Sequence, residues 1–433
     1  MLERLDLAGL PADSLGDHLP RPEVGGEEPL AAVREIISEV RSRGDDALRE
    51  YAERFDGSAP DVFRVATTEL DAAIERLTSD LVDALQFAHD SIEAFHRTQL
   101  HGPQSHVYSG MLVEGLQLPV ERAGCYVPGG RAAYPSTVLM TAVPAKVAGV
   151  EEVCLCVPPT GDGRVADVTL AAARIAGVDE VYAIGGAQAI AAMAYGTESI
   201  AGVDVIAGPG NVYVAVAKRE VAGDVGVAAA FAGPSEIVVV ADATVPVSYA
   251  AIDLVVQAEH GPGGLAWLIT TDSGVADSVT TEVCRLASES PRRSDIEATL
   301  AAGGYAVVVD DAEAAMVVAN AIAPEHLQLM VAEPRALLPL VRNAGAVFCG
   351  PYSPASVGDY VAGPSHVLPT NGTARFAGAL TVQDFCKDIH VITLDQDALE
   401  RVAPAVAAIA DAEGLAAHAD SVRVRQGTEE TNG

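Results

Sequence analysis

Two strand–turn–helix stretches, EVYAIGGAQAIAAMAYG (180–196) and VDVIAGPGNVYVAVAKREV (203–221), decide the fold class. Each opens with a short run of small apolar residues, passes through glycines and continues into a segment with helical spacing. Units of this length predict parallel strands joined by right-handed crossover helices. We therefore expect an α/β protein.

The stretches on both sides predict a second domain of the same kind. VEEVCLCVPP (150–159) adds a strand before them, and further strand-like runs follow at EIVVVAD (236–242), LAWLITTD (265–272), YAVVVDD (305–311) and GAVFCG (345–350). At 433 residues the chain is also too long for one ordinary core. We expect two Rossmann-like parallel-sheet domains, both incomplete, with small N- and C-terminal arm segments.

The boundaries follow from changes in the pattern, since residues 29–100 show apolar residues at helical three- and four-residue spacing. The expected segments are an N-terminal arm (1–28), a helical segment (29–120) that packs with residues 237–375 as the first domain, a second domain (121–236) and a C-terminal arm (376–433). The C-terminal arm should contain a helix, a strand-like SVRVR (421–425) and a disordered end (426–433).

Composition excludes several classes of function. The chain has 60 acidic and 27 basic residues and a net charge of −33, and nucleic acid is excluded as a partner because phosphate contacts need basic patches. The acids are spread along the chain, as on surfaces adapted to high salt. No run of 18 apolar residues occurs, and the charged N-terminus lacks the apolar segment of a signal peptide. We expect a cytoplasmic protein of a high-salt-adapted organism, without membrane contact.

The helical stretch VSYAAIDLVVQAEHGPGG (247–264) carries half of a metal site. Gln257 and His260 lie three residues apart, so both side chains leave one face of the helix. Gly261 and Pro262 end the helix at once, which places His260 in its last turn. A histidine that only caps the helix end is the alternative, and this motif alone does not decide between the two.

Two further segments carry polar residues of the same kind. The loop GPYSPASVGDYVAGPSHVLPTNG holds Asp359 and His366 between strand-like flanks, and long irregular loops of this kind are usually functional or disordered. AEGLAAHAD holds Glu413 and His418, whose five-residue spacing requires a bend at Gly414 if both are to face one site. A solvated helix end is the alternative for this second segment.

APEHLQLM (323–330) contains two adjacent proton acceptors. Pro324 restricts the residue before it, so the preceding helix is expected to stop by Ala323. Glu325 and His326 would then be exposed on a turn before an alternating strand. A carboxylate beside an imidazole suits acid–base chemistry near neutral pH, and a surface pair without function is the alternative.

Glycine turns follow strands of the expected second domain. GPGN, which contains Asn211, lacks the third glycine of a dinucleotide fingerprint and the acidic residue about 20 positions later that holds a ribose. YVPGG after Tyr126 and IGGAQA around Gln188 mark two further strand-to-turn junctions, where helix N-termini offer free N–H groups to a pyrophosphate. AGPSE places Ser235 in another tight turn. The turns by themselves give an incomplete dinucleotide signature.

Together, these motifs resemble the histidinol dehydrogenase family over residues 29–420. The pieces are YVPGG, PSTVLM, GGAQAIAA, AGPGNVYVA, AGPSE, QAEHG, PEHL, GDY, HVLPT, GTARF and EGL, in the family's order and spacing. Each piece is short, but the whole set in register is highly specific. The resemblance implies a dehydrogenase that oxidises L-histidinol to L-histidine through histidinal, the last step of histidine biosynthesis.

The resemblance also implies the cofactors and the site. One zinc per subunit would be held by Gln257, His260, Asp359 and His418. The substrate positions are Ser235, His326, Glu413 and the four zinc ligands, and the catalytic pair is Glu325 and His326. NAD would contact Tyr126, Gln188 and Asn211. A homodimer with a site shared between subunits is likewise implied, and His366 receives no catalytic role.

The implied chemistry explains the unusual residues. Hydride removal from an alcohol requires a base for the O–H proton, which suits His326, and oxidation of the aldehyde requires added water, which Glu325 would activate. The mixed nitrogen and oxygen ligands would orient the substrate, and they would also suit manganese or cobalt. Three alternatives stay open: a thiohemiacetal on Cys125, a relative acting on another amino alcohol or polyol, and a zinc-containing binding protein without catalysis.

Overall fold

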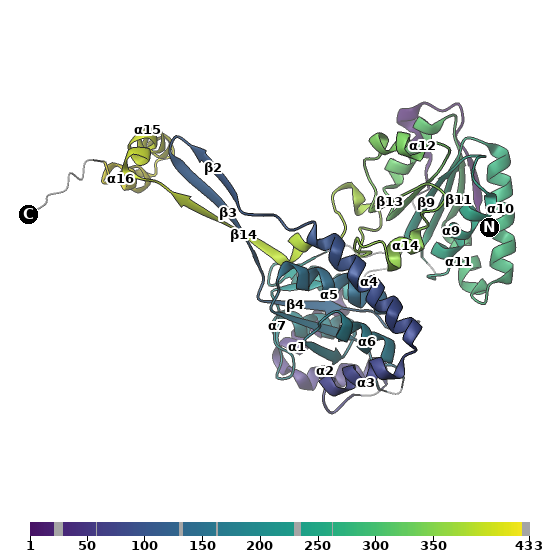
Figure 1. Cartoon of the computed structure of the whole chain (residues 1–433), viewed down its shortest axis with the longest axis horizontal. Helices are drawn as coiled ribbons and strands as arrows, with labels where there is room; N and C mark the ends of the chain where they lie inside the picture. The colour runs from purple at the N-terminus through teal and green to yellow at the C-terminus, as the bar shows by residue number, and fades with distance from the viewer. Residues whose placement is uncertain are drawn as a thin grey trace, which may run out of the picture. The chain divides into compact units, whose positions relative to one another are not determined.

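The computed structural model describes residues 1–20, 29–57, 59–129, 133–161, 163–228, 235–261 and 263–426. They fall into two compact units (Figure 1). Unit 1 comprises Met1–Gln99 and Val120–Phe385, and unit 2 comprises Leu100–Pro119 and Cys386–Gly433. The predicted disorder at the C-terminus falls almost wholly outside the described residues. Within the described part of the chain, no helix combines the length and apolar character needed to cross a bilayer.

Unit 1 contains a six-stranded sheet with order β1-β11-β10-β9-β12-β13, in which all neighbouring strands are parallel. Its strands are β1 (Glu3–Asp6), β9 (Glu236–Ala241), β10 (Leu265–Thr270), β11 (Gly304–Val308), β12 (His326–Met330) and β13 (Ala346–Cys349). Strands β9 to β12 are buried at every position, which accounts for continuous apolar runs such as EIVVVA. The predicted α/β class is confirmed, although β12 does not alternate as expected and the N-terminal arm supplies the edge strand β1.

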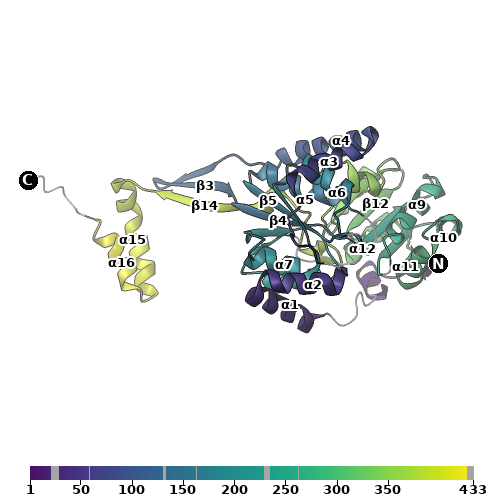
Figure 2. The same cartoon turned by 90° about the horizontal axis from the view of Figure 1, so that it is seen from below.

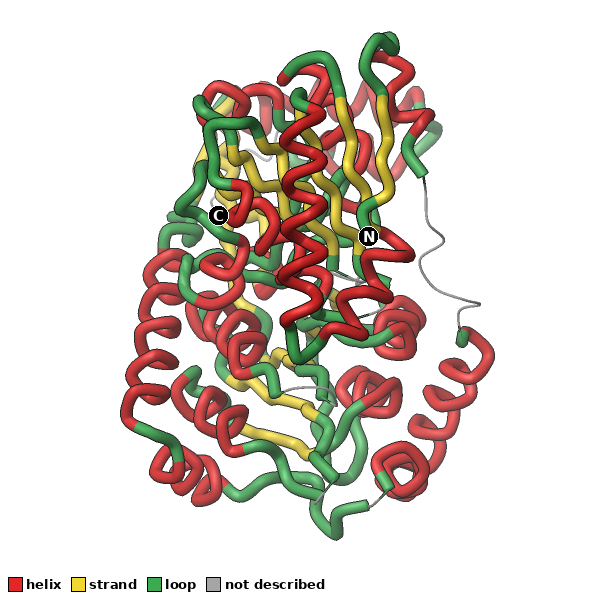
Figure 3. The backbone as a smooth tube through the Cα atoms, turned by 90° about the vertical axis from the view of Figure 1, so that its right-hand side faces the viewer, coloured by secondary structure: helices red, strands yellow, loops and turns green. Residues whose placement is uncertain are grey.

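Helices cover both faces of this sheet (Figure 3). α9 (Val247–Ala258), α10 (Ser273–Glu289) and α11 (Arg293–Gly303) pack on one face, and α12 (Ala312–Ile322) and the 3-10 helix η1 (Ala12–His18) pack on the other. Successive strand residues point to opposite faces. Ile237 and Val239 of β9 therefore join the core under α9, and Val238 and Val240 join the core under α12.

A five-stranded parallel sheet with order β6-β5-β4-β7-β8 is the second sheet of unit 1. Its strands are β4 (Arg122–Tyr126), β5 (Glu152–Val157), β6 (Glu180–Ala183), β7 (Val205–Ala207) and β8 (Gly226–Val227). α5 (Pro135–Ala148) and α6 (Asp167–Ile175) pack on one face, and α7 (Gly186–Tyr195) and α8 (Val212–Val221) pack on the other. The two stretches that predicted strand–turn–helix units form β6–α7 and β7–α8.

Four N-terminal helices pack around the five-stranded sheet. They are α1 (Leu30–Arg43), α2 (Asp45–Asp56), α3 (Thr67–Arg76) and α4 (Ser79–Arg97). Val33 and Leu48 join the core on the α7 face, and Leu70 and Ile92 join the core on the α5 face. The helical prediction is confirmed up to Arg97, but residues 104–119 of the expected helical segment (29–120) form two strands, and the expected packing against residues 237–375 is wrong. Amphipathic spacing shows that a helix has an apolar face and does not show which sheet that face covers.

The remainder of unit 1 is mostly irregular and carries short helices. They are α13 (Pro334–Leu337), η2 (Leu338–Leu340), α14 (Ala355–Tyr360), η3 (Thr373–Arg375) and η4 (Val382–Phe385). Val367, Leu380 and Phe385 are buried in the core on the α5 face of the five-stranded sheet. The chain therefore returns from one sheet to the other, and residues 376–385 belong to unit 1 rather than to the expected C-terminal arm.

Unit 2 is a three-stranded antiparallel sheet with order β14-β3-β2, followed by a helical hairpin (Figure 2). Its elements are β2 (Gln104–Tyr108), β3 (Met111–Pro119), β14 (Cys386–Thr393), α15 (Gln396–Ala412) and α16 (Ala416–Arg423). The expected strand at residues 421–425 is wrong, because Ser421–Arg423 complete α16. The buried residues of α16, Ala419 and Val422, follow helical spacing. The five alternating residues 421–425 are too few to distinguish this spacing from that of a strand.

Candidate active site

The expected catalytic pair, Glu325 and His326, lies where β12 begins. Ala323 ends α12 in a left-handed backbone conformation with φ 53°, which confirms the predicted helix end. Glu325 is only 7% exposed and His326 only 4%, so the expected exposed turn is wrong. The strand starts at His326 itself and lies between β9 and β13, and this position buries both side chains.

Glu236, the first residue of β9, fixes both members of the pair through its backbone. Its N–H donates to Glu325 Oε2 at 3.0 Å, and its carbonyl oxygen lies 3.2 Å from His326 Nδ1. Glu325 Oε2 also lies 3.6 Å from Nδ1. A carbonyl oxygen can only accept, so Nδ1 carries the hydrogen and Nε2 is the proton-accepting nitrogen of the neutral imidazole.

Asp359 of α14 faces that second nitrogen, with its Oδ1 3.6 Å from His326 Nε2. Burial acts to lower the pKa of His326, but the Glu325 and Asp359 carboxylates outweigh it and raise the pKa to about 9. Burial also raises the pKa of Glu325 to about 6, against the opposing charge of His326. The three side chains therefore form a tightly coupled acid–base cluster at the N-terminal end of β12.

His366 anchors the segment that carries Asp359. Its Nδ1 lies 2.9 Å from the Asp359 carbonyl oxygen, and its Nε2 lies 3.1 Å from Thr137 Oγ1 on α5. Both ring nitrogens therefore have partners within unit 1. His326, Asp359 and His366 line one cleft of about 580 Å³, so His366 helps to shape the site without a free nitrogen for chemistry.

Gln257 and His260 lie at the end of α9. The helix ends at Ala258 with Glu259 as its cap, so the exposed His260 lies beyond the helix and not in its last turn. His260 Nδ1 is 3.4 Å from Ser235 Oγ, and its charge interacts with that of Asp359. The structure thus brings Ser235, His260 and Asp359 to the same region as the catalytic pair.

The donor set of Gln257, His260 and Asp359 fits a metal ion in chemical type. Gln257 is 3% exposed, and its Nε2 has no hydrogen-bond partner among the described residues. A metal ion would bind this amide through Oε1, because the unpaired Nε2 is an N–H donor that calls for an acceptor instead. Across the described ranges, however, no three His, Cys, Asp or Glu side chains converge into a ready metal site.

Tyr126 is the last residue of β4, Gln188 lies in the first turn of α7 after β6, and Asn211 is the N-cap of α8 after β7. All three therefore lie near the carboxyl ends of strands, and the Gly186 N–H donates to the Tyr126 hydroxyl at 3.0 Å, which joins the first two positions. Gln188 is 1% exposed, and its Oε1 lacks a partner in the described part of the chain. Asn211 caps α8. Ligand crevices of open α/β sheets form at such carboxyl ends, so the position suits a nucleotide.

Comparison with known proteins identifies the family. Residues 19–426 match the family described as histidinol dehydrogenase. The chain is 51% identical over 401 residues to the histidinol dehydrogenase of a Synechococcus strain, covering 92% of each chain. It is 48% identical over 399 residues to that of Moorella thermoacetica, covering 92% of this chain and 94% of the relative. The crystal structure of histidinol dehydrogenase from Elizabethkingia anophelis matches with a TM-score of 0.92 at 34% identity, covering 97% of both chains.

The chain belongs to the histidinol dehydrogenase family. This membership confirms the resemblance found in the sequence and makes the protein an oxidoreductase. Two residues that the histidinol dehydrogenase resemblance assigns to the site, Glu413 and His418, lie in unit 2, whereas the others lie in unit 1. Glu413 caps α15, Gly414 turns the chain with φ 74°, and His418 lies in α16. Both side chains are exposed on the helical hairpin, and their part in the site stays a prediction.

Three buried polar residues of this histidinol dehydrogenase family member are missed by sequence reasoning. Glu236 holds the catalytic pair, and Asp253 lies one helical turn before Gln257, 5% exposed and with Oδ2 unpaired among the described residues. Lys218 Nζ donates to the Gly208 carbonyl at 2.9 Å, beneath the GPGN turn. Only Lys218 had a local signal, as one of the chain's few lysines in an apolar helical segment. The carboxylates look like ordinary surface residues in sequence.

Proposed function

We propose that the protein oxidises L-histidinol to L-histidine through histidinal, as the last step of histidine biosynthesis. The observation that carries the proposal is the buried Glu325–His326 pair, because it provides two unlike proton acceptors at one place. A four-electron oxidation in two steps needs both, one for an alcohol proton and one for a proton of added water. The names of the relatives give the substrate.

His326 is the base of the first step in this proposal. Its Nδ1 is committed to the Glu236 carbonyl, which fixes the ring and directs Nε2 toward Asp359 in the cleft. Asp359 is one of the two carboxylates that raise the pKa of His326, so a cation bound to Asp359 would favour the neutral imidazole. In that form, Nε2 accepts the hydroxyl proton of the substrate as the carbonyl forms. Orientation by a backbone carbonyl keeps the accepting nitrogen in place through both steps.

Glu325 activates water for the second step. Its pKa, raised by burial to about 6, leaves it a carboxylate at neutral pH that is still basic enough to accept a proton. The Glu236 N–H holds the Oε2 atom of this carboxylate. Water added to the aldehyde gives the hydrate, from which the second hydride leaves and the carboxylate product forms.

A metal and NAD complete the proposed site. Gln257, His260, Asp359 and His418 would hold the zinc, and Tyr126, Gln188 and Asn211 would contact NAD. The metal would fix the nitrogens of the substrate and offset the Asp359 charge, and NAD would take up a hydride in each step. Ser235 and Glu413 are the remaining proposed substrate contacts, with Glu413 facing the substrate ammonium. We also propose a homodimer whose subunits share the site.

A cysteine mechanism for the aldehyde step finds no support in the geometry. Cys125 is fully buried, and burial raises the pKa of its thiol to about 12. Its side chain joins the core on the α5 face, whereas neighbouring Tyr126 joins the core on the α7 face. A protonated, inaccessible thiol cannot attack an aldehyde, so Cys125→Ala should retain the aldehyde step.

Substitution of the pair separates the two steps. Glu325→Gln should lower NADH formation from histidinol by about 10²–10⁴-fold, yet retain much of the reduction of histidinal by NADH, which reverses the first step. His326→Asn should lose both reactions. The rates are measured by absorbance of NADH with each substrate. Unchanged turnover of histidinol by Glu325→Gln would contradict the assignment, and Cys125→Ala serves as the control.

A further inference from the structure

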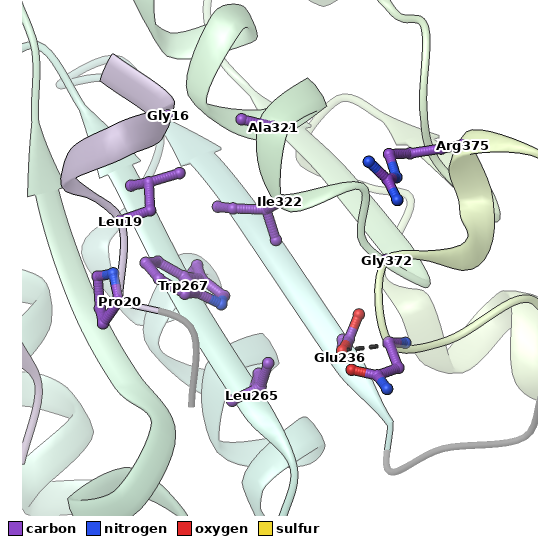
Figure 4. Close-up of a pocket in the computed structure, with 11 residues that line it drawn as sticks. Gly16, Leu19, Pro20, Glu236, Leu265, Trp267, Ala321, Ile322, Gly372 and Arg375 are labelled. Atoms are coloured by element: carbon purple, nitrogen blue, oxygen red, sulfur yellow. Dashed lines mark hydrogen bonds between the residues drawn. The ribbon is translucent and has the colours of Figure 1, made fainter. Parts of the chain in front are cut away.

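A pocket of about 230 Å³ lies on the α12 face of the six-stranded sheet (Figure 4). It is formed by η1 and the residues after it, the first residues of β9 and β10, the end of α12, and η3 with the turn before it. Its apolar walls are Leu19, Pro20, Leu265, Trp267 and Ile322. Its lining includes none of the residues assigned to the proposed reaction.

Glu236 turns its side chain into this pocket. It shares a strand face with Val238 and Val240, which lie in the core under α12. Glu236 is 2% exposed, its Oε1 accepts the Asn371 N–H at 3.1 Å, and its Oε2 has no partner among the described residues. Burial, and then the Glu325 carboxylate, raise the pKa of Glu236 to about 8. A buried carboxyl group with one unsatisfied oxygen calls for a cation or a donor at that point.

Two further polar groups at the pocket have no partner in the described part of the chain. Trp267 is 2% exposed and stacks on Tyr305 with ring centroids 4.2 Å apart, and its indole Nε1 donates to no acceptor among the described residues. The exposed Arg375 lines the other end of the pocket and forms no ion pair with a described residue (Figure 4). An arginine without a carboxylate partner in the described ranges is available to bind an anion.

These groups match one class of small molecule. A free α-amino acid carries an ammonium for Glu236, a carboxylate for Arg375 and a side chain for the apolar wall. A simple amine would leave Arg375 unused, and a simple carboxylic acid would bring no cation to Glu236 Oε2. We propose that this pocket binds a free α-amino acid with an apolar side chain, its ammonium on Glu236 and its carboxylate on Arg375.

A ligand bound in the pocket would affect the catalytic pair through one residue, Glu236. The Glu236 backbone holds Glu325 and His326 on its N–H and carbonyl oxygen, while its side chain lines the pocket. An ammonium ion at Glu236 also places a positive charge near the Glu325 carboxylate and stabilises its charged form. The pocket is therefore an effector site. This role rests on the proposed function, whereas binding of the amino acid does not depend on it.

Tryptophan fluorescence reports on the pocket directly, because Trp267 is the only tryptophan of the chain. L-Leucine titrated into the full-length protein without substrate should change the emission saturably. Leucine amide lacks the carboxylate, and 4-methylpentanoic acid lacks the ammonium, so each should bind about tenfold more weakly or worse. A flat titration with L-leucine, or equal binding of the amide, overturns the proposal.

The exposed Arg375 gives a substitution that tests binding independently of folding, and the buried Glu236 gives a second one. Arg375→Gln should weaken L-leucine binding about ten- to a hundredfold, and Glu236→Gln should weaken it similarly. Arg54→Gln removes an exposed arginine from α2, outside the pocket, and should bind like the wild type. Wild-type affinity in Arg375→Gln overturns the assignment.

The effector role has its own readout, separate from binding and from the proposed function. Saturating L-leucine should shift the initial rate of NADH formation from histidinol in the wild type and leave the Arg375→Gln rate unchanged. An unshifted wild-type rate contradicts the effector role. Binding of L-leucine is measured without turnover, so a negative binding result does not contradict the proposed function. Conversely, a protein that forms no NADH from histidinol would contradict the proposed function but not the binding result.

Discussion

At the scale of single residues, His326 has one nitrogen committed to structure and one directed to the cleft. The Glu236 carbonyl takes Nδ1, and Asp359 faces Nε2. Because the first partner belongs to the backbone of β9, a side-chain substitution at position 236 does not remove it. The tautomer is therefore set by the strand pairing of β9 with β12 rather than by a neighbouring carboxylate.

Asp253 makes a pH-dependent contribution to stability. Burial raises the pKa of its carboxyl from 3.8 to about 6. Between these values the folded protein keeps a proton that the unfolded chain releases, so stability falls as the pH rises through this range. Asp253→Asn cannot ionise, and its stability relative to the wild type should grow by about 2 kcal/mol between about pH 4.5 and 7.5. Urea unfolding at the two pH values measures the difference.

The matched control for this experiment is Asp83→Asn, at an exposed position of α4. It should change stability by less than about 0.5 kcal/mol at either pH. A stability difference between Asp253→Asn and the wild type that is the same at both pH values would rule out the buried, protonated carboxyl.

At the scale of elements, α8 combines a structural cap with a proposed NAD contact. Asn211 Oδ1 accepts the N–H groups of Tyr213 at 3.0 Å and Val214 at 3.1 Å. Aspartate caps as well as asparagine, so Asn211→Asp should unfold within about 0.5 kcal/mol of the wild type, whereas Asn211→Ala should lose about 1 kcal/mol. The new carboxylate would repel the pyrophosphate and raise the KM for NAD about tenfold.

Urea unfolding and the KM for NAD, measured on both variants, separate the two roles. Asn211→Asp with wild-type stability and an unchanged KM for NAD would reduce Asn211 to a helix cap. Loss of stability in Asn211→Asp would contradict the capping geometry instead.

The sequence predicts those elements whose own residues show the apolar pattern of a strand or a helix. β9 and β10 are continuous apolar runs too short for a helix, and α1 to α4 have apolar residues at helical spacing. The missed strands β2 and β14 are exposed at nearly every position, so no apolar pattern marks them. Their strand conformation comes from pairing with β3, which is separated from β14 by most of the chain.

The same distinction between local and long-range information holds for the site residues. The Glu325–His326 pair is adjacent in sequence and was predictable, whereas its burial depends on β12 lying between β9 and β13. Glu236 is 89 residues from Glu325 in sequence, and no local pattern links its backbone to that carboxylate. Contacts of this kind depend on the topology of the sheet.

At the scale of the whole molecule, the proposed ligands are divided between the two units. Gln257, His260 and Asp359 belong to unit 1, and His418 belongs to unit 2. A site shared between subunits stays a proposal, as does the adaptation to high salt suggested by the net charge of −33.

Complementation tests the shared site. His260→Ala and His418→Ala should each be inactive, but a mixed dimer would contain one intact site. Random pairing then recovers about a quarter of the wild-type activity. Mixing His260→Ala with Gln257→Ala is the control, since both positions lie in unit 1, and it should recover nothing. Equal recovery in both mixtures, or none in the first, contradicts sharing.

The stoichiometry of NADH tests the central claim most directly. A limiting, known amount of L-histidinol is incubated with the protein, zinc and excess NAD until absorbance at the NADH band stops rising. The account predicts two NADH and one L-histidine per histidinol, because the alcohol and aldehyde steps each release one hydride. One NADH with accumulated histidinal would contradict the role of Glu325, and no NADH would contradict the proposed function.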